Sequence, residues 1–422
     1  LCRQGCITSV SFLYKRKPFC KRQTQIGCIF QAKSDCLTKQ QLKFISLLAG
    51  IAVSLLLYFV NPFGVSPAAA KVLAIAGLMI TWWITEALPM PVVALLPLVL
   101  FPLLKISSIK ATGAFYGNEV IFLFMGGFML GLAIEKWNLH RRIALNIVRL
   151  TGTSGDRIIL GFILATGLLS MWLSNTATTM MMFPIALSVI HVMKENNKGE
   201  GSIRNFSLTI MLAIAYAANI GGIATIIGTP PNVAYKGYIK EAYNYEIGFV
   251  DWMLLCTPIA ILLLATLYWV MVKWLFPNRI KSDFATKQLI KDELAALGPV
   301  SSNEKRVLVI FISTALLWIT KDLINVTQSV IKLNDTIIAV IGAVALFVCP
   351  AEGEKSDSIL EWDDTQKMAW GILLLFGGGI SLANGLENAG LMQELGQWLS
   401  QFAGNQFILV LVITIVTIFL SE

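Results

Sequence analysis

Charged side chains are scarce in this chain. Only 14% of its 422 residues are Asp, Glu, Lys or Arg, whereas a soluble domain carries about a quarter. Hydrophobic residues make up 56%, and the mean hydropathy is +0.71. No single water-soluble core can hide so many apolar side chains, so the bilayer must solvate much of the surface. The composition therefore predicts an all-α polytopic membrane protein.

Residues that carry enzyme or metal chemistry are also few. The sequence has two histidines, His140 and His191, and lacks HExxH, GxSxG and paired carboxylates within an apolar run. These absences argue against a membrane-embedded enzyme. Five of the seven cysteines lie before residue 37 at spacings that match no zinc site, and Cys256 and Cys349 lie in apolar runs. We expect both histidines at the surface, no disulfide framework and no cofactor.

Basic charge is concentrated in the first 43 residues, which hold nine Lys or Arg residues and one acid, Asp35. The net charge of the whole chain is +8, so the remainder is neutral overall. A basic segment before the first apolar run predicts a cytoplasmic N-terminus and no secretory signal peptide. We interpret residues 1–43 as a disordered or non-native tail, and the charge gives no indication of nucleic-acid binding.

Apolar runs follow one another closely along the rest of the chain. A full crossing needs about 17–25 residues, and the runs at 91–104 and 336–349 fall short of that. Residues 157–193 differ, because two apolar legs flank the polar triplet Ser174-Asn175-Thr176. We predict a re-entrant hairpin that turns at this triplet, since irregular backbone at membrane depth is tolerated only inside protein or beside an aqueous cavity. The other runs are 44–60, 69–88, 119–136, 206–228, 252–276, 306–320 and 369–386.

The sequence contains an internal repeat. Residues 124–135 resemble residues 375–387, with Gly126-Gly127 aligned on Gly377-Gly378, 251 residues apart. The same separation aligns Ser170 with Ser421. Duplicated halves with broken helices at matching positions are typical of secondary transporters, whose binding site lies between the repeats.

The repeat predicts how the chain is organised. We expect an inverted-repeat transporter with a first repeat at 44–276, a polar loop at 277–305 and an incomplete second repeat at 306–422. The segment 406–420 would be the first leg of a second hairpin. At the same separation a second Ser-Asn-Thr triplet is expected just beyond residue 422, at positions 425–427.

Polar side chains gather around the predicted hairpin tip. Oxygen ligands that converge beside a helix break suit a hard cation, and the free N–H groups at the start of a half-helix suit an anion. The alternative is a hydrogen-bonded cluster that only joins helices. The cluster comprises Ser170, Ser174, Asn175, Thr176, Thr178 and Thr179.

A second break follows the apolar run at 206–228. Gly221-Gly222 precedes the sequence Gly228-Thr229-Pro230-Pro231-Asn232, and glycine with two prolines ends a helix and exposes carbonyl groups. Alone, this pattern is typical of an ordinary helix end. No Lys or Arg occurs in residues 158–190 or 206–235. An anion bound between the two breaks must therefore be neutralised by cations and helix dipoles, which predicts cation-coupled uptake.

Four stretches resemble the divalent anion:sodium symporter family, which includes bacterial carriers of succinate, malate and fumarate. The resemblance extends from about residue 44 to the end of the sequence, and the combination of SNT with a downstream GTPPN is its most specific part. The stretches are GGFMLGLAIEKWNLHRRIAL (126–145), SMWLSNTATTMMMFPIA (170–186), YAANIGGIATIIGTPPN (216–232) and LLLFGGGISLANGLENAG (373–390).

The resemblance implies roles for individual residues. It implies sodium-coupled uptake of C4-dicarboxylates across the cell (inner) membrane by a homodimer with an elevator-type motion. The implied sodium ligands are Ser170, Ser174, Asn175, Gly228 and Ser421, and the implied substrate contacts are Asn175, Thr176, Thr229 and Pro230.

Two rival functions share this fold. One is a sodium-independent exchanger of organic anions, against which the SNT tip counts only weakly. The other is a carrier of an inorganic oxyanion such as sulfate. A channel is disfavoured because broken, repeated helices do not form a continuous pore.

Overall fold

The computed structural model describes residues 39–61, 64–196, 200–278, 280, 284–328, 332–353, 357–400 and 406–421. The chain divides between Ile45 and Ser46 into two units, and the contacts described below lie within the second, Ser46–Glu422. The expectation for the tail at 1–43 falls almost wholly outside the described residues. Within the described ranges the regular elements are helices, and one isolated β-bridge pairs Pro350 with Ser358.

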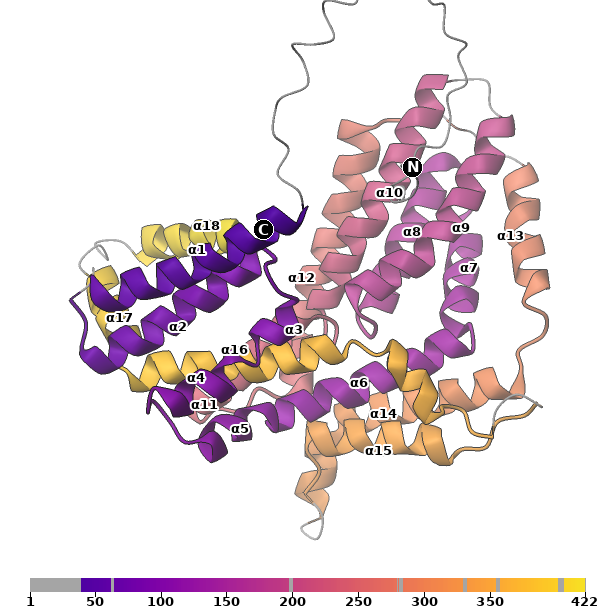
Figure 1. Ribbon diagram of the computed structural model, residues 1–422. Coiled ribbons are helices and arrows are strands. Elements are labelled where there is room, and N and C mark those ends of the chain that lie inside the picture. The colour runs from indigo at the N-terminus through magenta and orange to yellow at the C-terminus, as the bar shows by residue number, and fades with distance from the viewer. Residues whose placement is uncertain are drawn as a thin grey trace, which may run out of the picture. The chain divides into compact units, whose positions relative to one another are not determined.

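The helices are labelled in chain order (Figure 1). They are α1 (Lys39–Phe59), α2 (Pro67–Ile84), α3 (Met90–Val93), α4 (Leu96–Leu103), α5 (Ile109–Tyr116), α6 (Glu119–Lys136), α7 (Leu139–Thr151), α8 (Gly155–Ser170), α9 (Asn175–Asn196), α10 (Glu200–Ile223), α11 (Pro230–Tyr243), α12 (Phe249–Trp269), the π-helical η1 (Val270–Leu275), α13 (Phe284–Ala296), α14 (Ser302–Thr327), α15 (Asp335–Val348), the 3₁₀ turn η2 (Trp362–Lys367), α16 (Trp370–Asn388), α17 (Leu391–Ser400) and α18 (Gln406–Ser421).

Eight stretches of helix in the described part of the chain are long and apolar enough to cross a membrane. Seven of them coincide with predicted runs, and the eighth, Asn175–Glu195, is the return leg of the predicted hairpin. The two runs predicted to be short form the shorter apolar helices Met90–Leu103 and Asp335–Val348. The prediction of an all-α polytopic membrane protein is confirmed, since hydropathy alone locates apolar helices of this length.

The predicted hairpin is made by α8 and α9, which are joined by a turn at residues 171–174. Helix α10 packs against both legs, and α12 packs against α8 and α10, so these helices lie side by side (Figure 1). The packing leaves Ile158, Phe162 and Ile163 of α8 fully buried. The hairpin is therefore packed against α10 and α12.

The repeat is visible in the bounds of the helices. Helices α6 and α16 begin at Glu119 and Trp370, which are 251 residues apart. Helices α8 and α18 begin at Gly155 and Gln406, again 251 residues apart, and end at Ser170 and Ser421. The side chain of Ser421 lies outside what the structure describes. The separation of 251 residues that aligns the two halves in the sequence therefore also separates the first residues of α6 and α16 and both ends of α8 and α18.

One glycine of each pair lies at a close crossing of two helices. A Cβ atom on Gly126 of α6 would overlap the backbone of Ala339 in α15, and one on Gly378 of α16 would overlap the backbone of Ala94, just after α3. Each glycine lets two helix backbones approach closely, as small residues do in membrane bundles. Helix α6 of the first half therefore packs on α15 of the second half, and α16 of the second half packs on α3 of the first half.

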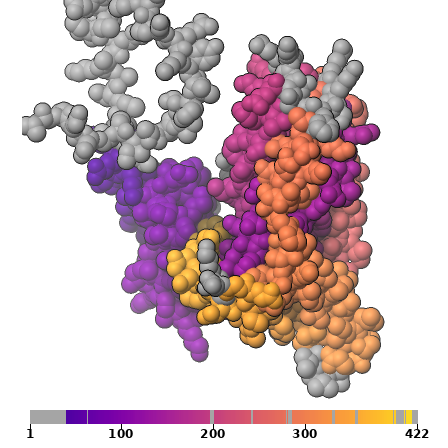
Figure 2. All heavy atoms as spheres, turned by 90° about the vertical axis from the view of Figure 1, so that its right-hand side faces the viewer, coloured from indigo at the N-terminus to yellow at the C-terminus, as the bar shows by residue number. Residues whose placement is uncertain are grey.

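The basic residues of α7 fit an interfacial helix with its basic face on lipid headgroups, but the structure gives Arg141 and Arg142 protein partners. The side chain of Arg142 bonds Glu304 of α14 at 2.6 Å and the carbonyl groups of Leu297 and Gly298 at 3.1 and 3.0 Å. Arg141 forms an ion pair with Glu293 of α13. The apolar face of α7 packs on α8, and α13 covers α7 and α9 on the face shown in Figure 2. The amphipathic pattern thus reflects packing within the protein.

The two histidines differ in their surroundings. The prediction that His140 lies at the surface is wrong, because it is 8% exposed and its Nδ1 lies 3.2 Å from the carbonyl oxygen of Ile134. Burial lowers the pKa of His140 below its usual 6.5, so this imidazole is neutral at pH 7. His191 is exposed, as predicted, and lies 3.2 Å from Glu195 one turn along α9.

Candidate functional site

The tip of the hairpin is built by the end of α8 and the start of α9. Helix α8 ends at Ser170, and α9 starts at Asn175. The Ser174 hydroxyl accepts a hydrogen bond of 3.3 Å from the backbone N–H of Ala177, which is the capping role that serine favours before a helix. Thr176 is exposed in the first turn. The polar triplet therefore forms the N-terminus of a helix, where free backbone N–H groups attract negative charge.

Ser170 is fully buried where α8 meets α10. Its hydroxyl lies 2.7 Å from the carbonyl oxygen of Ala218 and 2.9 Å from Oδ1 of Asn175. Both neighbours are acceptors, and a serine hydroxyl has one hydrogen to donate. Three oxygen atoms thus converge around a single hydrogen, which is an arrangement that a hard cation with oxygen ligands satisfies better.

Asn175 occupies the centre of the cluster. Its Nδ2 donates to Oδ1 of Asn219 at 3.1 Å and lies 3.5 Å from Oγ1 of Thr229. A Cβ atom on Gly222 would overlap Oδ1 of Asn175. A side chain at position 222 would therefore displace the amide, so glycine is required for the close approach of α10 to the hairpin tip.

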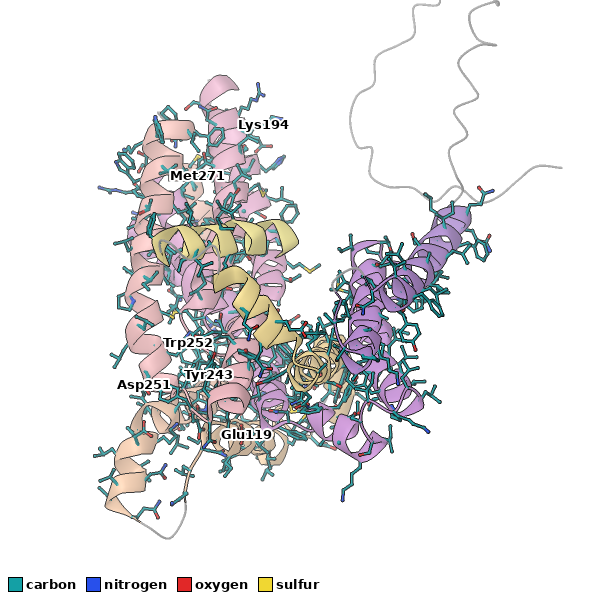
Figure 3. All side chains as sticks on the ribbon, turned by 90° about the vertical axis from the view of Figure 1, so that its left-hand side faces the viewer. Glu119, Lys194, Tyr243, Asp251, Trp252 and Met271 are labelled. Carbon is teal, nitrogen blue, oxygen red and sulfur yellow. The ribbon has the colours of Figure 1, made fainter. Side chains whose placement is uncertain are left out.

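The break after α10 is held by side chains from both sides. Asn232, which is buried in α11, donates through Nδ2 to the carbonyl oxygens of Gly222 and Thr225 at 2.9 and 2.8 Å. Trp252 of α12, labelled in Figure 3, donates to the carbonyl oxygen of Ile223 at 2.9 Å. Gly228 is buried in this break, and its N–H donates to Thr225. These bonds satisfy carbonyl groups that the end of α10 leaves free.

The two breaks meet as complementary helix ends. Helices α9 and α11 begin at the site, and Pro230 is the first residue of α11. Helices α8 and α10 end beside them at Ser170 and Ile223. Two helix N-termini carry partial positive charge, and two C-termini carry partial negative charge and carbonyl oxygens. The geometry thus offers an anion site next to a cation site.

The structure does not bring every predicted residue to one point. Ser170, Asn175, Gly228 and Thr229 share the junction between the hairpin and the break. Ser174 lines a separate small cavity of about 80 Å³ with residues of α6 and with the segment before α16. The next basic residue after the break is Lys236, which is buried against Asp335 and therefore not free to neutralise an anion at the site.

The profile of the sodium:sulfate symporter transmembrane region matches residues 41–422. The chain belongs to this family. The match confirms the resemblance to divalent anion:sodium symporters that the SNT and GTPPN motifs indicated.

Two similar proteins come from staphylococci. The sodium-dependent dicarboxylate transporter SdcS of Staphylococcus saprophyticus is 40% identical over 411 residues, covering 95% of this chain and 79% of the relative. The protein of the same name from Staphylococcus aureus strain USA300 is 42% identical over 380 residues, covering 88% of this chain and 72% of the relative. Both relatives are transporters rather than enzymes.

Two residues of the site, Asn219 and Trp172, were not predicted from the sequence. Asn219 lies inside an apolar helix and carries no turn signal, although it is the partner of Asn175. Trp172 lies in the hairpin turn and stacks on Phe249 and Trp318 with ring centroids 6.2 and 6.4 Å apart. Aromatic stacking contributes about 0.5–1.5 kcal/mol per pair beyond the buried area. The stack therefore anchors the turn that presents Ser174 and Asn175.

Proposed function

We propose that this protein couples inward sodium movement to the uptake of C4-dicarboxylates of the succinate, malate and fumarate type. The observation that carries the proposal is the meeting of two helix N-termini with converging oxygen ligands, built by residues 158–190 and 206–235, which contain no Lys or Arg. A dianion bound there needs cations for neutralisation. The names of the two staphylococcal relatives support sodium and a dicarboxylate as the transported pair.

The proposed roles of the site residues follow the same logic. Sodium is bound by oxygens of Ser170, Ser174, Asn175, Gly228 and Ser421. One substrate carboxylate is bound by Asn175, Thr176, Thr229 and Pro230, at the starts of α9 and α11. Asn175 belongs to both sets because its amide has an oxygen for the cation and an NH₂ group for the anion.

The organisation of the whole protein is proposed on the family resemblance and on the repeat. The first repeat spans 44–276, the polar loop spans 277–305, and residues 306–422 form an incomplete second repeat. The protein acts in the cell (inner) membrane with a cytoplasmic N-terminus, as a homodimer whose transport domain moves in an elevator-type motion. A sulfate carrier is the second candidate, because the family profile is described by sulfate symport.

The binding of succinate should depend on the binding of sodium, and the reverse should also hold. We expect succinate to raise the melting temperature of the purified protein in sodium but not in potassium or choline, because the dianion is bound only after cations neutralise the site. A ligand at 100 times its Kd stabilises a protein by about 2.7 kcal/mol. The measurement is a thermal unfolding series in detergent, with sulfate as the comparison anion. Equal stabilisation by succinate in choline would favour the sodium-independent exchanger, and stabilisation by sulfate alone would favour the oxyanion carrier.

A further inference from the structure

Asn219 of α10 lies outside the polar cluster at the hairpin tip and outside the Gly228–Asn232 break, and it bonds directly to Asn175. The Nδ2 group of Asn175 donates to Oδ1 of Asn219 at 3.1 Å. The preceding residue, Ala218, provides the carbonyl oxygen that accepts from Ser170 at 2.7 Å. Two consecutive residues of α10 therefore hold the last residue of α8 and the first residue of α9.

We propose that Asn219 is a positioning residue that sets the orientation of the Asn175 amide, and thereby the sodium affinity of the site. This inference rests on the proposed function and deepens it. The Asn175 amide has one acceptor oxygen and one donor nitrogen, and turning it over exchanges them. Holding Nδ2 against Asn219 leaves Oδ1 beside Ser170, where the cation ligands converge.

The surroundings of Asn175 give this role to Asn219. Gly222 has no side chain, so it leaves space for the Asn175 amide and cannot form a side-chain hydrogen bond with it. Thr229 lies at 3.5 Å, the limit of a hydrogen bond, and its hydroxyl both donates and accepts, so it favours neither orientation. Asn219 is exposed, and its Oδ1 is the atom that faces Nδ2 of Asn175. Its side chain acts through Asn175 and is not assigned as a ligand of the ion.

The test uses three variants of the full chain and measures uptake against sodium concentration. Asn219→Leu keeps the approximate size and removes the acceptor, Asn219→Asp keeps the acceptor and adds negative charge, and Tyr216→Phe changes an exposed residue of the same helix. A single hydrogen bond corresponds to about a 2- to 10-fold change in an equilibrium constant. We expect Asn219→Leu to raise the half-saturating sodium concentration by that factor while Tyr216→Phe leaves it unchanged.

The aspartate variant separates positioning from direct contact with the anion. If Asn219 positions Asn175, Asn219→Asp restores the half-saturating sodium concentration and raises the KM for succinate. Wild-type sodium dependence in Asn219→Leu, or a higher succinate KM in both variants without a change in sodium, would overturn the inference.

A second measurement keeps the inference independent of transport. In the absence of sodium and substrate, the shifts in melting temperature caused by Asn175→Ala and Asn219→Leu should be non-additive in the double variant, because both remove the same bond. Additive shifts would contradict the inference. Failure of the proposed function is a different result, since the wild-type protein itself would then show no sodium-dependent uptake.

Discussion

Replacing Asn175 by alanine is expected to abolish uptake while the protein still folds and inserts. In the proposed roles, Oδ1 of Asn175 binds sodium and Nδ2 binds a substrate carboxylate, so the variant loses contacts to both charged ligands. A hydrogen bond to a charged group contributes about 1.5–3 kcal/mol. Loss of two such contacts corresponds to a reduction in uptake of about 100-fold or more. The measurement is the initial rate of succinate uptake in sodium, normalised to folded protein in the membrane.

The control for this experiment is the same substitution at Asn146. Asn146 lies in α7 and donates one hydrogen bond of 2.8 Å, to the carbonyl oxygen of Arg142 within its own helix. Asn146→Ala is expected to leave uptake unchanged. A hydrogen bond that only joins helices in a membrane is worth about 1 kcal/mol. A folded Asn175→Ala protein with normal uptake would therefore place Asn175 among the residues that only connect helices.

The largest expected effect on stability is at Asp335. This carboxylate is 1% exposed and receives hydrogen bonds from two buried ammonium groups, Lys236 of α11 and Lys321 of α14. Trp318 also donates to its backbone carbonyl at 3.0 Å. Removing one partner of a buried ion pair costs about 3–5 kcal/mol, because an uncompensated charge stays buried. Asp335→Asn leaves two such charges, and we expect a decrease of at least this size in the free energy of unfolding.

Two matched variants test the cause of that decrease by unfolding in mixed micelles. Asp322 is also 3.9 Å from Lys321, but its side chain is 69% exposed, so Asp322→Asn should change stability little. Replacing Lys236, Lys321 and Asp335 together with apolar residues of similar size should restore much of the stability, since no charge then remains buried. Equal destabilisation by Asp322→Asn and Asp335→Asn would show that desolvation of the lysines is not the cause.

The sequence predicted those parts of the fold that depend on hydropathy and on breaks in it. The long apolar helices and the turn of the hairpin lie where the apolar runs and the Ser174-Asn175-Thr176 triplet indicated. The repeat was also predictable, because the separation of 251 residues read from the sequence recurs between the starts of α6 and α16 and of α8 and α18. These features follow from local composition and from a regular spacing, both of which one sequence contains.

Contacts between distant segments could not be predicted in this way. The partner of Lys236 is 99 residues away in the sequence, and nothing near Lys236 indicates that its charge is buried. Arg142 lies in an amphipathic helix, whose sequence looks the same whether lipid or protein covers it, and its partner Glu304 is 162 residues away. Asn219 was missed because a polar residue inside an apolar helix has no motif of its own.

The most direct test of the proposed function is uptake of labelled succinate into proteoliposomes that contain the full-length protein. The external salt is sodium, potassium or choline chloride, and the internal solution is free of sodium. We expect accumulation above equilibrium only with an inward sodium gradient, and its collapse when an ionophore dissipates that gradient. Uptake at the same rate in choline or potassium, or uptake that requires an internal organic anion instead of sodium, would contradict the account.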